Sequence, residues 1–434
     1  MTASASASAN ASANAPANAS QDAPFAASPV RAAGPIAKEV ARVESELNAF
    51  WSTPDKAPDG SSIAKTRAST MTYVALGERA EVERLEEQAE ALAETHAGRS
   101  FMITADPSIP SDLVEASWSA TCRREGGVII CRDRVELCFG AGAESRAPSV
   151  VSALALSDVP LLVEIAPGAP PEVADALAAS CDRLIVDSAE LPAPRIAALA
   201  RRSRGPLADR AFIRTHSWRD LTARLFDHAP AALRTIRRVE IARTEGPGPD
   251  PAALFLGWLA SRLGWTFTSR HRATDAAGSP IEIVLNDAPP CSLDPSRRPA
   301  RPARPARPAD TKARTTAGPP ATSGKTDAPE AAATSPEGRD EGATTAAAVD
   351  TFRRLDAIRF EATLDGEPLT LACARLPQAQ GAVRWTLSGA RTAEHVHRLG
   401  RRDEAWVLTK AIDATEGDRV LRDASLAAAV WSAT

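Results

Sequence analysis

The sequence predicts an α/β protein: an N-terminal domain with an open, mostly parallel sheet and an antiparallel excursion, followed by a smaller α+β domain. Short apolar strands alternate with amphipathic, helix-length segments between residues 71 and 203, which is the pattern of strand–helix–strand crossovers. The chain has 434 residues, more than a single hydrophobic core normally serves. A segment of low complexity, residues 291–350, interrupts the second half.

Composition divides the chain into ordered and disordered parts. Residues 1–33 are rich in Ser, Ala, Asn and Pro and contain few large apolar side chains, so we expect a disordered tail. Residues 291–350 include an Arg-Pro-Ala repeat that favours extended polyproline II. We interpret this segment as a disordered insertion that acts as a spacer, with docking to a partner as the alternative. The N-terminal domain is then 34–205, and the second domain is 206–290 with 351–434.

Charge and cysteine content limit the classes of function. The 51 Lys and Arg nearly balance the 55 Asp and Glu, which argues against a dedicated nucleic-acid binder with a basic surface. No segment reaches the roughly 18 apolar residues of a membrane-spanning helix. The N-terminus resembles no secretory signal, and the six cysteines contain no C-x-x-C pair. We therefore expect a cytoplasmic protein with reduced thiols.

The first predicted elements form a parallel crossover. Met71–Leu76 is apolar and short, as expected of a buried strand. A helix is predicted over residues 79–97, with Gly98 placed to end it. Ser100–Ala105 is the next strand. A helix of this length between two strands brings them side by side in parallel.

The next elements add a hairpin and then resume the crossovers. Residues 113–122 and 127–139 alternate apolar and polar side chains around Gly126 and Gly127, so they predict an antiparallel pair. The crossover pattern then predicts helices at 146–156, 171–180 and 193–203 and strands at Val159–Ile165 and Arg183–Val186.

The second domain is predicted from looser patterns on both sides of the insertion. Its expected helices are Ser217–Asp227, Pro251–Leu263, 391–400 and 419–431. Its expected strands are Arg237–Ala242, Thr266–His271, Ile281–Leu285, Ala357–Leu364, Leu369–Ala374 and Val383–Leu387.

Most motifs for catalysis and cofactor binding are absent from the sequence. No glycine-rich G-x-G-x-x-G turn or G-x-S-x-G elbow occurs, and Gly324-Lys325-Thr326 lies in the insertion without the earlier glycine of a P-loop. His395 and His397 would point to different sides of the predicted helix 391–400, which disfavours metal binding. We therefore assign no catalytic, cofactor-binding or metal-binding residue.

One polar pair closes a predicted strand. Asp187 and Ser188 follow Arg183–Val186 directly. Ligands of open α/β sheets gather at the carboxyl ends of strands, so this pair is a candidate small-molecule site. The alternative is that the two side chains cap the following turn by accepting backbone N–H groups.

Tryptophan and arginine mark the start of the second domain. Five residues of this kind stand out, and they are Trp218, Arg219, Trp258, Arg262 and Trp265. The helical spacing of their apolar neighbours indicates core packing. Trp and Arg are also the preferred anchors of protein interfaces, so these positions are candidates for partner binding as well.

Three segments of the sequence together resemble those of a known family. They are Cys181–Ser188, Ile213–Asp227 and Gly257–Trp265, and with weaker supporting segments their order and spacing extend over about residues 68 to 290. The chain resembles the OpcA family, the assembly proteins and allosteric effectors of glucose-6-phosphate dehydrogenase.

The resemblance implies a function and also shows two departures. A family member would be non-catalytic, would bind glucose-6-phosphate dehydrogenase and would promote its active assembly; its own oligomeric state is left open. Family members commonly carry a Trp-Trp pair where this chain has Val163–Pro167, and cyanobacterial relatives carry clustered C-terminal cysteines where it has Cys373 alone. The alternative from the residues themselves is an enzyme or sensor that binds a nucleotide or sugar phosphate near Asp187 and Ser188. A third hypothesis is a scaffold that acts through the Arg-Pro insertion.

Overall fold

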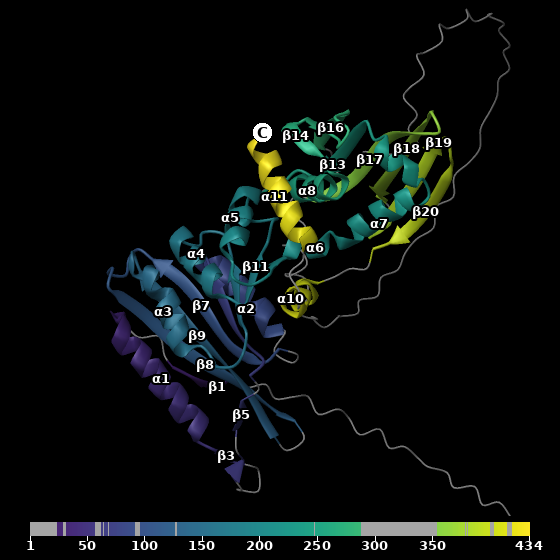
Figure 1. Cartoon of the computed structure of the whole chain (residues 1–434). Helices are drawn as coiled ribbons and strands as arrows, with labels where there is room; N and C mark the ends of the chain where they lie inside the picture. The colour runs from purple at the N-terminus through teal and green to yellow at the C-terminus, as the bar shows by residue number, and fades with distance from the viewer. Residues whose placement is uncertain are drawn as a thin grey trace, which may run out of the picture.

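The computed structural model describes residues 24–28, 32–56, 62–63, 65–67, 69–91, 96–125, 128–246, 248–287, 354–377, 379, 381–399, 403–414 and 419–434. Residues 1–23 of the expected tail and the whole predicted insertion, 291–350, lie outside these residues. The described part confirms the α/β class, since it contains two large sheets with helices packed on them (Figure 1). None of its helices combines the length and apolarity needed to cross a bilayer.

The first sheet has ten strands, with the order β1-β8-β9-β7-β6-β10-β11-β12, β2 on β8 and β5 on β9. Its strands are β1 (Pro24–Ala27), β2 (Gly34–Pro35), β5 (Lys65–Arg67), β6 (Met71–Leu76), β7 (Gly98–Asp106), β8 (Leu113–Glu125), β9 (Val128–Gly140), β10 (Leu161–Ile165), β11 (Arg183–Val186) and β12 (Leu207–Asp209). Neighbours from β9 through β12 are parallel, whereas β8 and β9 form an antiparallel hairpin. The predicted parallel sheet and its antiparallel excursion are confirmed.

The helices of this sheet cover both of its faces. They are α1 (Ile36–Ser52), α2 (Arg79–Ala91), the short 3-10 helix η1 (Ala143–Arg146), α3 (Ala147–Leu154), α4 (Pro171–Ser180) and α5 (Ala193–Arg202). Side chains of α1, α3, α4 and α5 share one apolar cluster with the sheet. On the opposite face, α2 shares a second cluster with α10 (Glu404–Asp413), which comes from the end of the chain. The first sheet is therefore completed by a helix that the N-terminal segment does not contain.

The N-terminal boundary differs from the expectation. Pro24–Ala27, within the predicted disordered tail 1–33, form β1 and pair with β8. Backbone hydrogen bonds to an existing strand need no large apolar side chain, so composition gave no sign of this strand. The helix α1 that follows was also missed, although Val43 and Leu47 on it are buried.

The sequence predicts that Gly98 ends a helix, but the structure shows that it does not. It is the first residue of β7, and α2 ends at Ala91. A Cβ atom at Gly98 would lie 2.1 Å from the carbonyl oxygen of Met71 on the neighbouring strand. The glycine is needed for the close approach of two strands.

The second sheet has eight strands in the order β14-β15-β16-β13-β17-β18-β19-β20. These strands are β13 (Arg238–Arg243), β14 (Thr266–Ser269), β15 (Arg272–Thr274), β16 (Pro280–Asp287), β17 (Leu355–Leu364), β18 (Glu367–Arg375), β19 (Ala382–Gly389) and β20 (Ala393–Arg398).

The remaining elements are a small ladder of β3 (Asp55–Lys56) with β4 (Ser62–Ile63), and α6 (Arg210–Arg214), α7 (His216–Asp227), the 3-10 helix η2 (Pro230–Arg234), α8 (Pro251–Leu263) and α11 (Arg419–Ala433). Residues of α7, α8 and α11 form the apolar cluster with the second sheet. Both β16 and β17 pair with β13, so the two chain segments that flank residues 288–353 belong to one sheet.

The predicted helix at 391–400 is wrong. Ala393–Arg398 form β20, which pairs antiparallel with β19. On a strand, residues two apart lie on the same face, so His395 and His397 are neighbours with ring centroids 6.4 Å apart rather than on different sides of a helix.

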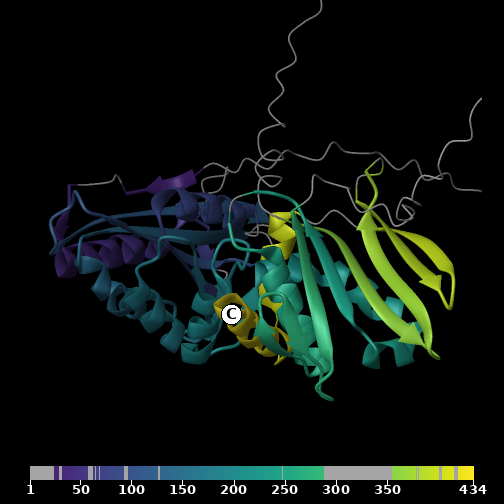
Figure 2. The same ribbon diagram turned by 90° about the horizontal axis from the view of Figure 1, so that it is seen from above.

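Residues just after the predicted domain boundary at 205–206 still belong to the first sheet. Residues 207–209 form β12, which extends the first sheet by pairing with β11. The guanidinium of Arg183 on β11 donates to the carbonyl oxygens of Ala411, at 3.2 Å, and Ile412 at the end of α10. The C-terminal segment of the chain is thus fastened to the first domain (Figures 1 and 2).

Two of the cysteines depart from the expectation of reduced thiols, whereas Cys138, Cys181 and Cys373 are free. Cys122 on β8 lies directly opposite Cys131 on β9, and the two form a disulfide with a Cα–Cα distance of 4.1 Å. The hairpin register brings them together, which spacing in the sequence alone did not indicate. Their side chains are buried beneath Phe50 and Trp51 of α1.

We predict that this disulfide stabilises the first domain. Closing a loop of about ten residues is worth about 2–3 kcal/mol through the entropy of the unfolded chain. Replacing both Cys122 and Cys131 with Ser should lower the free energy of unfolding by about this amount, measured by urea denaturation. The wild type should lose comparable stability when dithiothreitol is added, whereas the double variant should not respond. A wild type insensitive to the reductant would contradict the prediction.

Candidate functional site

The predicted pair Asp187 and Ser188 lies at the carboxyl end of β11. The Asp187 side chain is buried, and its carboxylate accepts hydrogen bonds from Arg214 Nη1 at 3.0 Å and Nη2 at 2.6 Å. It also accepts the backbone N–H of Ala189 at 3.0 Å, as expected of a turn cap. The Ser188 hydroxyl donates to Asp209 Oδ1 at 3.0 Å. Asp187 therefore caps the turn as the alternative interpretation expects, whereas the Ser188 side chain does not. Asp187 also forms an ion pair that the sequence did not indicate.

Arg214 continues the chain of charges to the C-terminal segment. Its Nε and Nη2 donate to the two carboxylate oxygens of Glu404 on α10, at 2.7 and 2.8 Å. Arg210 donates to Glu404 at 2.8 Å and to Glu164 on β10 at 2.9 Å. We refer to Glu164, Asp187, Arg210, Arg214 and Glu404 as the interdomain ion network.

Local structure explains how the two arginines reach this position. Asp209 ends β12 and caps α6 by accepting the N–H of Phe212 at 3.0 Å. Arg210 and Arg214 are four residues apart, so they lie on the same side of this short helix. Both are thereby aimed at carboxylates that come from different parts of the chain.

Glu404 is placed by its own helix. It lies in the first turn of α10, where Asp403 caps the helix by accepting the N–H of Trp406 at 2.7 Å. Negative side chains are stabilised in the first turn of a helix by its dipole. The start of α10 therefore presents a negative charge to Arg210 and Arg214.

Tyr73 of β6 closes the deep end of the network. Its hydroxyl donates to Glu164 Oε2 at 2.6 Å, and the side chain is fully buried. Burial, followed by the nearby charge of Glu164, raises the pKa of Tyr73 well above its ordinary value. The hydroxyl therefore keeps its proton and acts as a hydrogen-bond donor to Glu164.

Opposite charge keeps Asp187 and Glu404 ionised despite the burial of the network. Burial alone would raise the pKa of Asp187 and of Glu404, but the charge and hydrogen bonds of Arg214 outweigh it and lower both pKa values. Breaking such a pair leaves an uncompensated buried charge, which is strongly destabilising. The network therefore fixes α10 against the first sheet.

Two neighbouring carboxyl groups shift in the opposite direction. Burial, reinforced by the charge of Asp187, raises the pKa of Asp209 to about 6 and that of Glu190 to about 7. Asp209 Oδ2 is buried and finds no hydrogen-bond partner among the described residues. A negative charge on Asp209 is therefore poorly compensated.

The location of the network bears on ligand binding. Small molecules in open α/β sheets bind beyond the carboxyl ends of the strands. In the described structure, the ends of β10, β11 and β12 carry the carboxylates and arginines of the network, which bind one another. A phosphate group at Arg210 or Arg214 would have to displace Glu404.

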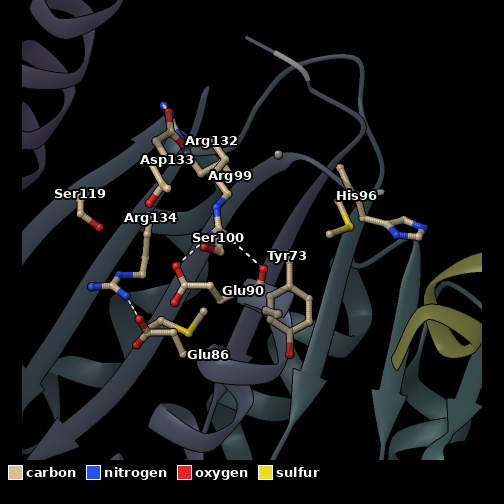
Figure 3. Close-up of a pocket in the computed structure, with 15 residues that line it drawn as sticks. Tyr73, Glu86, Glu90, His96, Arg99, Ser100, Ser119, Arg132, Asp133 and Arg134 are labelled. Atoms are coloured by element: carbon tan, nitrogen blue, oxygen red, sulfur yellow. Dashed lines mark hydrogen bonds and ion pairs between the residues drawn. The ribbon is translucent and has the colours of Figure 1, made fainter. Parts of the chain in front are cut away.

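A pocket lies on the α2 side of the first sheet, over β6, β7, β8 and β9 (Figure 3). Its arginines are paired with carboxylates: Arg132 with Glu90 at 2.6 Å, and Arg134 with Glu86. Figure 3 shows these two glutamates reaching the arginines from α2. Across all residues that the structure describes, no three His, Cys, Asp or Glu side chains gather closely enough to hold a metal ion.

The five aromatic and arginine candidates do not form one site. Trp218 and Trp265 belong to the core of the second domain. Arg219 is buried and donates to the carbonyl oxygen of Phe212 at 2.7 Å. Trp258 is half-buried and packs against the cores of both domains.

Arg262 alone among these candidates is exposed. Its side chain is 43% accessible, and it pairs with Asp423 of α11 at 3.2 Å. The structure therefore leaves Arg262 available to a partner, whereas Trp218, Arg219 and Trp265 contribute to packing.

Sequence reasoning missed Arg210, Arg214 and Glu404. The spacing of the two arginines directly after an Asp cap was a usable signal for a helix with one basic side. Nothing in the sequence connects residue 404 to that helix, because the contact joins segments 190 residues apart.

We predict that Arg214→Met strongly destabilises the protein, because Asp187 would remain buried without its main counterion and Glu404 would lose one of its two arginines. The expected loss is about 3 kcal/mol in the free energy of unfolding. Arg224→Met provides a matched control on the neighbouring helix, since Arg224 is 60% exposed in its pair with Asp220; its loss should stay below about 1 kcal/mol. Equal losses in the two variants, measured by denaturant titration, would refute the role of the network.

We predict a pH-dependent effect of Asp209→Asn. A carboxyl group whose pKa is raised on folding stabilises the protein while it is protonated, and that contribution is lost as the pH rises from 3.8 to about 6. Asparagine removes this dependence. Relative to the wild type, the variant should gain up to about 3 kcal/mol over this interval, measured by denaturation at a series of pH values. A difference that does not change with pH would contradict the prediction.

Comparisons with known proteins identify the family. Residues 89–204 match the family model for the N-terminal domain of the glucose-6-phosphate dehydrogenase subunit, and residues 205–425 match the model for its C-terminal domain. A putative OxPP cycle protein OpcA from Nostoc punctiforme is 36% identical over 164 residues, which cover 35% of this chain and 35% of that protein. The corresponding protein from a Synechocystis species is 30% identical over 177 residues, 38% of this chain and 37% of the relative. The matched segments thus span little more than a third of these relatives.

Similarity to solved structures is weak. A 3-ketoreductase from Actinomadura kijaniata matches with a TM-score of 0.42 and 12% identity over 84% of this chain and 96% of that one. A glucose-6-phosphate dehydrogenase in complex with its substrate matches with a TM-score of 0.39 and 9% identity, over 85% and 91% of the two chains. Neither score supports an argument about function. The two domain matches cover residues 89–425, and the chain therefore belongs to the OpcA family of glucose-6-phosphate dehydrogenase assembly proteins.

Proposed function

We propose that this protein is a non-catalytic partner of glucose-6-phosphate dehydrogenase that binds the enzyme and promotes its active assembly or allosteric activation. The observation that carries the proposal is the match of both domains, residues 89–425, to domains described as parts of a subunit of that enzyme. The relatives from cyanobacteria are named as proteins of the oxidative pentose phosphate cycle.

The interdomain ion network supports a role in binding a protein rather than a small molecule. Its arginines and carboxylates are engaged with one another at the strand ends where a ligand would otherwise lie. The same contacts hold α6 and α10 against the first sheet. A partner would therefore meet a preorganised surface, which reduces the entropy lost on binding.

The expected mechanism is a shift between states of the enzyme. An effector changes an equilibrium only by binding one state more tightly than the other. This protein would bind the active assembly of the dehydrogenase more tightly than its inactive form. The result would be a lower KM or a higher kcat, without any catalytic group from this chain. We place the complex in the cytoplasm, the compartment expected from the sequence.

The alternative, an enzyme or sensor for a nucleotide or sugar phosphate at Asp187 and Ser188, has less support. Asp187 is committed to Arg214, and Ser188 is committed to Asp209. A thermal-shift screen with nucleotides and sugar phosphates tests this alternative, and a clear rise in melting temperature would favour it.

The test of the proposal is to mix the purified full chain with the dehydrogenase of the same organism. Light scattering after size exclusion should detect a complex, and the kinetics of the enzyme should change when this protein is added. The absence of both a complex and a kinetic change would refute the proposed function.

We further predict that Arg262 contributes to the complex. Arg262→Glu should weaken binding to the dehydrogenase about tenfold at low salt, because a reversed charge at an interface slows association. The melting temperature of this variant should stay near that of the wild type. Arg224→Glu is the matched control, since Arg224 is similarly exposed and paired but lies outside the candidate set. If both variants bind the dehydrogenase with equal affinity, Arg262 is not part of the interface. This result would not contradict the proposed function.

A further inference from the structure

The strand β20 is an open edge of the second sheet. It pairs with β19 on one side and ends the strand order on the other (Figure 1). With six residues, it is the longest edge strand in the described part of the chain; the other sheet edges, β1, β12 and β14, have four, three and four. Edge strands expose a row of backbone donors and acceptors that can pair with another strand.

The register shows which backbone groups of β20 point outward. The N–H of Leu399 donates to the carbonyl oxygen of Gly381, which continues the ladder between β20 and β19. Bonded and non-bonded residue pairs alternate along an antiparallel ladder. His395 and His397 therefore bond to β19, whereas the backbone groups of Glu394, Val396 and Arg398 face away from the sheet.

These three residues also share one face of the sheet, because side chains two apart lie on the same side of a strand. All three side chains are exposed. Val396 is 57% accessible and is one of two large apolar side chains exposed in the described structure; the other is Val430 at 53%. An apolar residue at the centre of an open edge, flanked by an acid and a base, is suited to pairing with a strand of complementary pattern.

The pattern is complementary to itself. When two copies of β20 are placed antiparallel about Val396, each Glu394 lies opposite Arg398 of the second copy and the two Val396 side chains meet on the axis. The residues that pair in this way are those whose backbone groups point outward, so the geometry closes both hydrogen bonds at each pair. Sliding the strands until Glu394 or Arg398 meets its own copy would place like charges opposite each other, which is destabilising.

We propose that β20 is the interface of a symmetric dimer, in which it pairs antiparallel with β20 of a second copy of this chain about Val396. The two sheets then continue across the axis. The interface is isologous, as in most homodimers. This inference is independent of the dehydrogenase proposed above as a partner.

The test uses the full chain alone, in sedimentation or light-scattering measurements over a wide range of concentration. The wild type should dimerise. Val396→Lys should raise the dimer dissociation constant about tenfold or more, since both copies carry the charge on the axis. Val430→Lys is the matched control, an equally exposed valine on α11, and should dimerise like the wild type. A wild type that remains monomeric throughout, or equal effects of the two lysines, would overturn the proposal.

A charge exchange tests the register. Glu394→Arg and Arg398→Glu should each weaken the dimer about tenfold, because each places like charges opposite each other twice. The double variant should restore dimerisation in part, because opposite charges face each other again across the axis while the pair of Glu394 with Arg384 of β19, at 3.3 Å within one chain, is lost. Melting temperatures confirm that all variants fold. A double variant as weak as the single ones would overturn this register.

Hydrogen exchange distinguishes a second copy from another occupant. The amides of Glu394, Val396 and Arg398 should exchange more slowly at concentrations where the dimer forms. If they become protected only when the dehydrogenase is added, the edge binds that enzyme and the proposal of a self-interface is wrong.

Discussion

The pairing of Arg214 with Asp187 and Glu404 is the interaction on which the rest of the structure depends. It joins the end of a strand in the first domain to the first turn of α10, a helix from the end of the chain. Buried charges are tolerated only when each has a partner of opposite sign, so α6, β11 and α10 have to be present together. The first sheet is complete only with that helix, since α10 covers strands β10 to β12 on the face that α2 leaves open.

This constraint explains why a fold built from strand–helix crossovers differs from a ligand-binding α/β domain. The strand ends that receive a ligand in open sheets are filled here by side chains of the chain itself. Arg262 on α8 and the open edge at β20 lie on the outer surface, where other molecules can reach them.

Much of the fold follows from local sequence patterns. The strands Met71–Leu76 and Arg183–Val186 are short apolar runs, and their helices carry apolar residues at helical spacing, so the α/β class was predictable. The segment 391–400 does not show the alternation of apolar and polar side chains that marks a strand, because both faces of β20 carry polar residues. For this reason the sequence does not predict the strand. Asp187 was identified from its place after a strand, but Arg214 and Glu404 join it through contacts between distant segments. The pairing of Cys122 with Cys131 likewise depends on a hairpin register that composition does not determine.

The most direct test of this account is native-state hydrogen exchange of α10 compared with β11. If the ion network makes α10 part of the first sheet, amides of residues 407–413 should exchange with an opening free energy close to that of Leu184–Val186. Exchange of α10 through a separate opening of much lower free energy, while β11 stays protected, would contradict the claim that this network fixes α10 on the first sheet.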